Sequence, residues 1–338
     1  MRTLLMAGII GGAFVFTAAE AVAHEQVHAA GSSTVYPFVT AAAEQFGKKS
    51  GSATPIVEST GTGGGFKLFC AGDGHDTIDI ANASRAIEPS EREQCAKNGV
   101  KAITELKIGY DGIALANALS AAQFKLTKAQ IFLALAKQIP VGGKLVDNPH
   151  QKWNEIDPAL PAIGIKVYGP PPTSGTRDAF VELVMEPSCV KMPEVVAAYP
   201  DEIARKKACH LLREDGKYVE AGENDNLIIQ KLHSDTDALG IFGFSYLEQN
   251  KSVVQGSLVE GIAPSFEAVS KGTYPISRPL FVYVKNTHLK EMKNLKPFLQ
   301  ELVSDAAIGD EGYAVEKGLI PLKKDELLKT QAAVKALE

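Results

Sequence analysis

Three short segments place hydroxyl side chains and glycines together, each directly before a predicted helix: Gly31–Thr34, Thr60–Gly65 and Thr173–Thr176. A helix start leaves backbone N–H groups unpaired and carries a partial positive charge, and glycine gives an oxyanion room to approach them. Serine and threonine add short hydroxyl donors. One such segment alone is usually a helix cap. Three in one chain predict a cradle for a tetrahedral oxyanion.

The elements that must position these segments alternate along the chain. Short apolar or β-branched runs are followed by helical patterns, which favours an α/β architecture with mostly parallel sheets. Residues 141–161, rich in glycine and proline, are predicted to form a loop. The predicted strands cover residues 27–30, 54–58, 77–83, 107–116, 163–168 and 280–285, and the predicted helices cover 37–49, 89–98, 130–137, 175–185, 295–303 and 325–337, with a further helix opening at 63–65.

Five segments, in this order, resemble the phosphate-binding proteins of phosphate-specific ABC transporters. The resemblance extends over essentially the whole chain after residue 23. It implies a two-lobe type II periplasmic-binding fold, in which two crossing strands join the lobes and the ligand lies in the cleft between them. The segments are Gly31–Pro37, Glu58–Lys67, Asp79–Arg85, Gly109–Ile113 and Ser174–Phe180.

The same resemblance implies a division of the chain into lobes. The crossings would fall near Gly109–Ala114 and Tyr274–Leu280. Residues 24–109 and 278–338 would form lobe one, which contains both termini, and residues 110–277 would form lobe two. Closure of the cleft by hinge bending would then complete the cage around the ligand.

Ligand-contacting positions carry over one by one from the family. The first turn, the glycine-rich segment and the Ser-Arg pair belong to lobe one, and the Ser-Gly-Thr turn belongs to lobe two. Arg177, directly after that turn, is a further candidate because its planar fork matches a phosphate edge. The implied contacts are Ser33, Thr34, Val35, Thr62, Ser84, Arg85, Ser174, Gly175 and Thr176.

Two departures from the best-known branch of the family concern charge. Arg85 stands where that branch has an aspartate, and Pro170 stands where it has an arginine. A buried dianion needs a cationic partner. We predict Arg85 for this role ahead of Arg177, because Arg85 follows Ser84 at the end of a strand. The candidates for the lost carboxylate are Glu58, Asp111 and Asp178.

The N-terminus has the form of a secretory signal peptide. Residues 1–23 contain an early arginine, the apolar run Leu4–Phe16 and the small-x-small sequence Ala21–Ala23. The run is shorter than the ~20 residues that span a bilayer, and no comparable run follows. We expect a periplasmic protein without a membrane anchor. An oxidising compartment permits disulfides; sequence alone leaves three pairings, of which Cys70–Cys95 and Cys189–Cys209 are preferred because each pair lies in one region.

Composition and motifs exclude several other classes. A chain of 338 residues with 45% hydrophobic residues is long enough for about two globular domains. Its net charge of −5 argues against nucleic acid as a partner, which requires a clustered basic surface. His24–His28 matches a zinc-protease pattern, but it runs directly into a predicted strand where that pattern needs a helix. We expect no metal and no cofactor.

The predicted function is capture of inorganic phosphate by a monomer that delivers it to the inner-membrane permease of an ABC importer, without catalysis. An alternative of the same shape binds or senses arsenate, phosphite or sulfate. A secreted phosphatase is a different class, because a phosphate cradle can also hold a phosphoryl transition state. No set of histidines and carboxylates accompanies the three segments, which argues against it.

Overall fold

The computed structural model describes residues 26–222 and 224–338. The predicted signal peptide lies outside them, as do His24 and Glu25 of the zinc-protease pattern. His28, the last residue of that pattern, lies in a strand, where its Nε2 atom is 2.7 Å from Glu58 Oε2. No helix in the described ranges is long and apolar enough to cross a membrane.

The strands alternate with helices over the first third of the chain, as the sequence predicts. Their bounds are β1 His28–Gly31, β2 Ile56–Ser59, β3 Ile80–Ala83, β4 Ile103–Ala118, β5 Lys125–Leu126, β6 Gln138–Val141, β7 Lys144–Asp147, β8 Val167–Gly169, β9 Tyr218–Glu220, β10 Leu239–Gly243, β11 Val254–Gly256, β12 Leu258–Val259 and β13 Ser277–Lys285.

Most helices are short, and only α1, α9 and α15 reach ten residues in the described part of the chain. Their bounds are α1 Tyr36–Ser50, α2 Thr62–Phe69, α3 Pro89–Lys97, α4 Lys128–Leu135, η1 Trp153–Glu155, α5 Gly175–Phe180, η2 Val181–Met185, α6 Glu186–Cys189, α7 Pro193–Ala198, α8 Glu202–Cys209, α9 Asp225–Ser234, α10 Phe244–Gln249, α11 Phe266–Ser270, η3 Thr287–Lys290, α12 Leu295–Leu302, α13 Asp305–Ile308, α14 Tyr313–Glu316 and α15 Lys324–Lys335.

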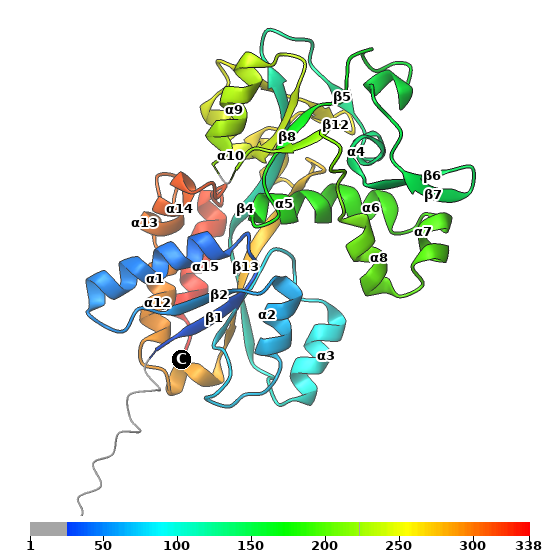
Figure 1. Ribbon diagram of the computed structural model, residues 1–338. Helices are drawn as coiled ribbons and strands as arrows, with labels where there is room; N and C mark the ends of the chain where they lie inside the picture. Colours follow the sequence, from blue (N-terminus) through cyan, green and yellow to red (C-terminus); the bar gives the residue numbers. More distant parts are fainter. Residues whose placement is uncertain (1–25, 223) are drawn as a thin grey trace, which may run out of the picture.

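Two lobes share one nine-stranded sheet (Figure 1). The strand order is β2-β1-β3-β13-β4-β10-β8-β9, with β11 also paired to β4. Strand β1 is parallel to β2 and β3, whereas β13 is antiparallel to β3 and β4. On the other side of β4, the neighbours β10, β8 and β9 are parallel to one another. The carboxyl ends of parallel strands are where α/β folds place ligands.

Strand β4 passes from one lobe to the other. Up to Gly112 it pairs with β13, and from Ile113 it pairs with β10. Strand β13 begins at Ser277 opposite Gly112, so the two strands run side by side where the lobes meet. In this register Arg278 lies opposite Asp111. The meeting point of the lobes therefore carries a pair of opposite charges.

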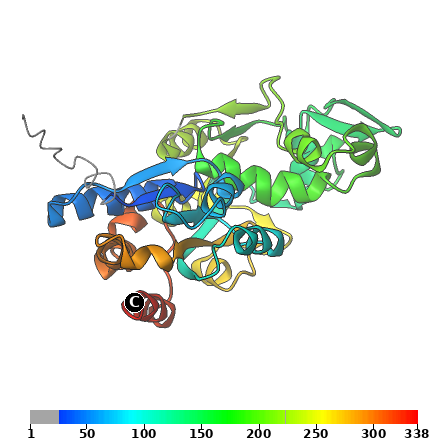
Figure 2. The same cartoon turned by 90° about the horizontal axis from the view of Figure 1, so that it is seen from below.

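The helices group around the two ends of the sheet. In Figure 1, α1, α2 and α3 lie with the C-terminal helices α12 to α15 around the β1–β2–β3 end, and α4 to α9 lie around the other end. Figure 2 shows α1 and the orange and red C-terminal segment in the same lobe although they come from opposite ends of the chain. We call the lobe with both chain ends the first lobe, and the other the second.

The predicted loop over residues 141–161 is only partly correct. Strands β6 and β7 form a hairpin there, and the η1 turn follows. The hairpin turn is Gly142–Gly143, with φ angles of 58° and 77°, which a two-residue turn between antiparallel strands requires. Strands this short are not distinguishable from a loop by hydrophobic alternation.

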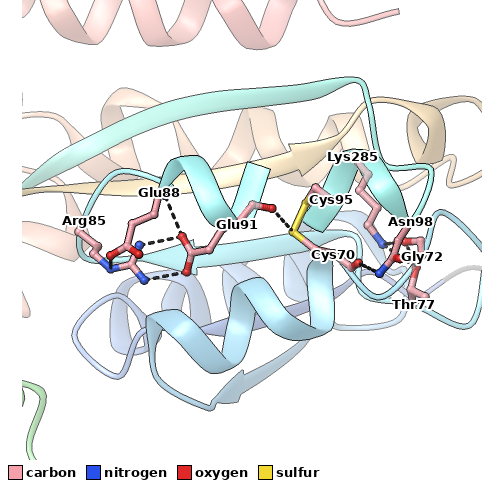
Figure 3. Close-up of a disulfide and its surroundings, with 9 residues drawn as sticks. All are labelled: Cys70, Gly72, Thr77, Arg85, Glu88, Glu91, Cys95, Asn98 and Lys285. Atoms are coloured by element: carbon pink, nitrogen blue, oxygen red, sulfur yellow. Dashed lines mark hydrogen bonds and ion pairs between the residues drawn. A yellow bond between two sulfur atoms is a disulfide. The ribbon is translucent and has the colours of Figure 1, made fainter. Parts of the chain in front are cut away.

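Both predicted disulfides are confirmed. Cys70–Cys95 joins the end of α2 to α3 across 25 residues, and Cys189–Cys209 joins α6 to α8 across 20 residues. Figure 3 shows the first bridge beside Glu91 of the same helix α3. Each disulfide thus fixes a pair of helices within one lobe.

Candidate functional site

A cleft of about 640 Å³ lies between the two lobes. Its first-lobe wall is the start of α2 and the segment after β3, its second-lobe wall is η2, α6 and α8, and the start of β13 lies between them. The lining residues are Gly61, Thr62, Gly63, Ser84, Arg85, Ala86, Glu88, Glu182, Leu183, Glu186, Ile203, Lys206, Lys207, His210, Arg278 and Pro279.

The turn after β1 depends on a glycine. Gly31 has a φ angle of +146°, and a Cβ atom there would come within 2.1 Å of the carbonyl oxygen of Asn82. The turn is therefore pressed against the end of β3. Val35 is fully buried and closes the turn into α1, while Ser33 and Thr34 direct their hydroxyls towards the second lobe.

The first turn meets the Ser-Gly-Thr turn of the second lobe directly. The Thr34 hydroxyl donates to the carbonyl oxygen of Gly175 at 3.1 Å, and a Cβ atom on Gly175 would come within 2.8 Å of Thr34 Cα. Ser174 caps helix α5 by accepting a hydrogen bond from the Thr176 N–H at 3.2 Å. The structure thus brings the first predicted segment against the second-lobe segment. The remaining segment, Thr60–Gly65, also contacts the first, because the Thr60 N–H donates to the carbonyl oxygen of Gly31 at 2.9 Å.

Thr62 and Ser84 form a second pair of donors on the first-lobe wall. Their hydroxyl oxygens are 3.0 Å apart, and the Ser84 N–H donates to the Thr62 hydroxyl at 3.1 Å. Helix α2 begins after Gly61, and no side chain caps its first amides. Free amides at a helix start suit an anion, and both hydroxyls line the cleft.

Arg85 lines the cleft, but its charge already has partners. Its two terminal nitrogens donate to the Glu91 carboxylate at 2.8 and 2.7 Å, and Glu88 lies 3.5 Å from Nε (Figure 3). The hydrogen bond that Arg85 donates to Glu91 raises the pKa of the guanidinium. Both terminal nitrogens of Arg85 are therefore bound by one carboxylate of its own lobe.

Arg177 lies away from the cleft. Its guanidinium packs over the Tyr218 ring at 4.6 Å and donates to the carbonyl oxygen of Pro170 at 3.3 Å. It lines a neighbouring cavity of about 680 Å³, which shares only His210 with the cleft. The predicted site residue Arg177 is therefore not brought together with Thr62 and Ser84.

Arg278 is the arginine that sequence reasoning missed. It lies at the start of β13, lines the cleft and is 8% exposed. Its Nη2 donates to the Thr34 hydroxyl at 3.0 Å, its Nε is 3.4 Å from Asp111 Oδ2, and its Nη1 bonds to Glu182. The available signal was a charged side chain inside the predicted crossing segment Tyr274–Leu280.

The three carboxylate candidates differ in position. Glu58 pairs with His28 and does not line the cleft. Asp111 lies beside Arg278, and its burial raises the pKa of its carboxyl group, while Arg278 acts in the opposite direction. Asp178 accepts a hydrogen bond from the Ser33 hydroxyl. Partial burial raises the pKa of Asp178, and that hydrogen bond opposes the effect.

The polar groups fall into two sets, which we name by position. The hinge cluster consists of Ser33, Thr34, Gly175 and Arg278, where the two lobes touch beside β4 and β13. The outer cluster consists of Thr62, Ser84 and Arg85 on the first-lobe wall. Arg278 connects the sets, because it contacts Thr34 and also lines the cleft with Thr62 and Ser84.

Comparison with known proteins gives consistent results. The sequence model of the PBP superfamily domain matches residues 17–306. Protein SphX of Synechococcus elongatus is 33% identical over 302 residues, which is 88% of this chain and 77% of SphX. The phosphate-binding protein PstS of Staphylococcus saprophyticus is 28% identical over 313 residues, which is 91% of this chain and 83% of PstS.

The fold is also similar to solved structures. A possible phosphate binding protein from Planctomyces limnophilus superposes with a TM-score of 0.75 at 26% identity, covering 92% of this chain and 97% of that protein. Because it covers 92% of this chain, the match extends over both lobes.

Proposed function

This chain belongs to the PBP superfamily, and from that premise we propose that it binds inorganic phosphate between its lobes and delivers it to an ABC importer. The similarity to a phosphate-binding protein PstS over 91% of the chain supports the ligand. The observation that carries the proposal is the position of Arg278, a buried cation at the meeting point of the lobes with hydroxyl donors around it.

The proposed binding site combines both clusters. Thr62, Ser84 and the free amides of α2 supply neutral donors from the first lobe, and the start of α5 supplies donors from the second. We assign the charge of the anion to Arg278 in place of Arg85. Each guanidinium has two carboxylate partners, but Glu91 binds both terminal nitrogens of Arg85, whereas Arg278 directs Nη2 to the Thr34 hydroxyl at the meeting point of the lobes. A guanidinium fork matches two oxygens of a phosphate group.

The proposed mechanism is closure around the ligand. We assign residues 24–109 and 278–338 to the first lobe and residues 110–277 to the second, with the hinge in β4 and the start of β13. The change of partner in β4 between Gly112 and Ile113 supports this boundary. Donors on both walls satisfy one anion only when the cleft closes, so binding and closure are coupled.

The proposed location is the periplasm, and the protein is proposed to act as a solute-binding subunit without catalytic activity. The signal peptide predicted over residues 1–23 and the two disulfides support an oxidising compartment outside the cytoplasm. The permease of a phosphate importer is the proposed partner. The permease would receive the anion from the closed form.

Calorimetric titration tests the ligand. The mature protein is titrated with phosphate, arsenate, phosphite, sulfate and molybdate in separate runs at one ionic strength. We expect saturable one-to-one binding of phosphate and much weaker binding of sulfate. Saturation by another oxyanion, with no heat from phosphate, contradicts the proposed ligand and leaves the fold assignment unchanged.

A further inference from the structure

Two carboxylates of the second lobe accept hydrogen bonds from donors of the hinge cluster. The Ser33 hydroxyl donates to Asp178, and the Arg278 Nη1 group donates to Glu182. Ser33 belongs to the first lobe and Arg278 to the start of β13. Both acceptors come from one helical segment of the second lobe. Arg278 is the cation that the proposed function assigns to the anion, and Ser33 belongs to the hinge cluster, which the proposed binding site includes.

The two acceptors are placed one helical turn apart. Helix α5 continues without a break through η2 into α6, so Asp178, Glu182 and Glu186 follow one another at four-residue intervals. Residues four apart lie on the same side of a helix. Asp178 and Glu182 therefore face the hinge cluster together, and each presents an anionic oxygen to a donor.

A carboxylate makes the same kind of bond that a phosphate oxygen would make. Charge-assisted bonds from a hydroxyl or a guanidinium to an anionic oxygen are short and strong for both acceptors. Ser33 has one proton to donate, so it cannot serve Asp178 and a bound anion together. A bound dianion close to Asp178 and Glu182 would also be repelled by them.

We propose that Asp178 and Glu182 are internal competitors for the phosphate site. In the ligand-free protein their carboxylates hold Ser33 and Arg278, and the anion binds by displacing them. This inference rests on the proposed function and extends it to the control of affinity. The competitors lower the affinity and assist release, because they return to the same donors when the anion leaves.

Glu186 provides a matched control. It has the same charge as Asp178 and Glu182, lies on the same helical segment and lines the cleft with Glu182. Its carboxylate pairs with His210 at 2.8 Å and Lys206 at 3.5 Å, and neither of these partners belongs to the hinge cluster. Removal of its charge changes the general electrostatic field of the cleft without freeing Ser33 or Arg278.

The test is a titration with inorganic phosphate of the wild-type protein and of Asp178→Asn, Glu182→Gln and Glu186→Gln. Each substitution keeps the size of the side chain and removes its charge. We expect Asp178→Asn and Glu182→Gln each to bind phosphate roughly tenfold more tightly, since one charge-assisted bond no longer has to be broken. We expect Glu186→Gln to stay within about twofold of the wild type.

A gain in affinity is informative because a damaged site loses affinity. Unchanged or weaker binding by both Asp178→Asn and Glu182→Gln overturns the competition, and so does an equal gain in Glu186→Gln, which would show a general charge effect. Weaker phosphate binding with stronger sulfate binding by Asp178→Asn would instead make Asp178 an acceptor of the phosphate proton. A wild-type protein that does not bind phosphate contradicts the proposed function, and the competition with it.

Discussion

The hinge cluster and the outer cluster contain similar donors in opposite situations. In the hinge cluster, Ser33, Thr34 and Arg278 are bonded to groups of the second lobe. In the outer cluster, Thr62 and Ser84 are bonded to each other and face the cleft. The hydroxyls of the hinge cluster are thus hydrogen-bonded across the lobes, whereas those of the outer cluster are accessible to a ligand in the cleft.

The difference follows from how each cluster is held. The hinge cluster is formed where two lobes press against each other, so its geometry depends on the packing of glycines as well as on its hydrogen bonds. The outer cluster is formed within one lobe, by the end of β3 and the start of α2. We therefore expect substitutions in the hinge cluster to affect folding and binding together, and substitutions in the outer cluster to affect binding alone.

The largest expected effect is that of Gly31→Ala, at the turn that leads into the hinge cluster. A Cβ atom would meet Asn82 O at 2.1 Å in a backbone conformation with φ of +146°. We expect a loss of about 2–5 kcal/mol of unfolding free energy from backbone strain and overpacking. Thermal or urea unfolding of the purified protein measures it.

Gly63→Ala is the control for this prediction. Gly63 lines the cleft, has no atom within 4 Å of its Cβ position and lies inside α2. Alanine there should keep or slightly raise stability, by about 0.5–1 kcal/mol, while its methyl group obstructs the phosphate. If Gly31→Ala and Gly63→Ala lose the same unfolding free energy, the expected difference in stability effects between the two clusters is wrong.

Arg278→Ala should have the largest effect on binding. The variant loses the guanidinium assigned to the anion, and we expect a cost of about 2–4 kcal/mol, or roughly thirtyfold to a thousandfold in phosphate affinity. Calorimetric titration measures the loss. Thermal unfolding should show lower stability as well, because Asp111 keeps a buried carboxyl group without its partner.

Arg278→Lys tests whether binding needs only a positive charge at this position or also the planar shape of the guanidinium. It retains a cation but not the planar fork, so its affinity should fall between those of the wild type and Arg278→Ala. Wild-type affinity in Arg278→Ala, in a protein that is shown to be folded, would remove Arg278 from the site.

Thr62→Ala should have a moderate effect that is confined to binding. The substitution removes one neutral hydroxyl from the cleft wall and one bond to Ser84. We expect a cost of about 1 kcal/mol, or roughly fivefold in phosphate affinity. Thr60→Ala is the matched control, because Thr60 is exposed and does not line the cleft; an equal loss in both variants would argue against a direct role for Thr62.

The smallest expected effect on binding is that of Arg85→Ala. Because Glu91 binds both terminal nitrogens of the guanidinium within the first lobe, its removal should change phosphate affinity by less than about threefold. Calorimetric titration of Arg85→Ala with phosphate measures this change in affinity. A loss larger than that of Arg278→Ala would restore the sequence-based prediction that Arg85 neutralises the anion.

Much of the first lobe could be predicted from sequence because its signals are local. Helices α1 and α3 have proline in the first turn, and β1 and β3 are short runs rich in small apolar residues. In the second lobe, α7 and α8 were not predicted. They have six and eight residues, too few for a helical period to be distinguished from an irregular polar segment.

The sequence by itself determined the three hydroxyl and glycine segments, the grouping of the cysteines into two local pairs of positions and the α/β alternation, because each depends on residues close together in the chain. Only the tertiary structure showed that Arg278 lies buried where the lobes meet and lines the cleft. Arg278 and Thr34 are 244 residues apart, and no local pattern joins them. Arg85 and Arg177 each follow a predicted binding motif in the sequence. In the structure, however, Glu91 pairs with Arg85, and Arg177 packs over the Tyr218 ring away from the cleft. Whether an arginine can contact the anion depends on the residues that surround it in space, and the tertiary fold determines which residues these are.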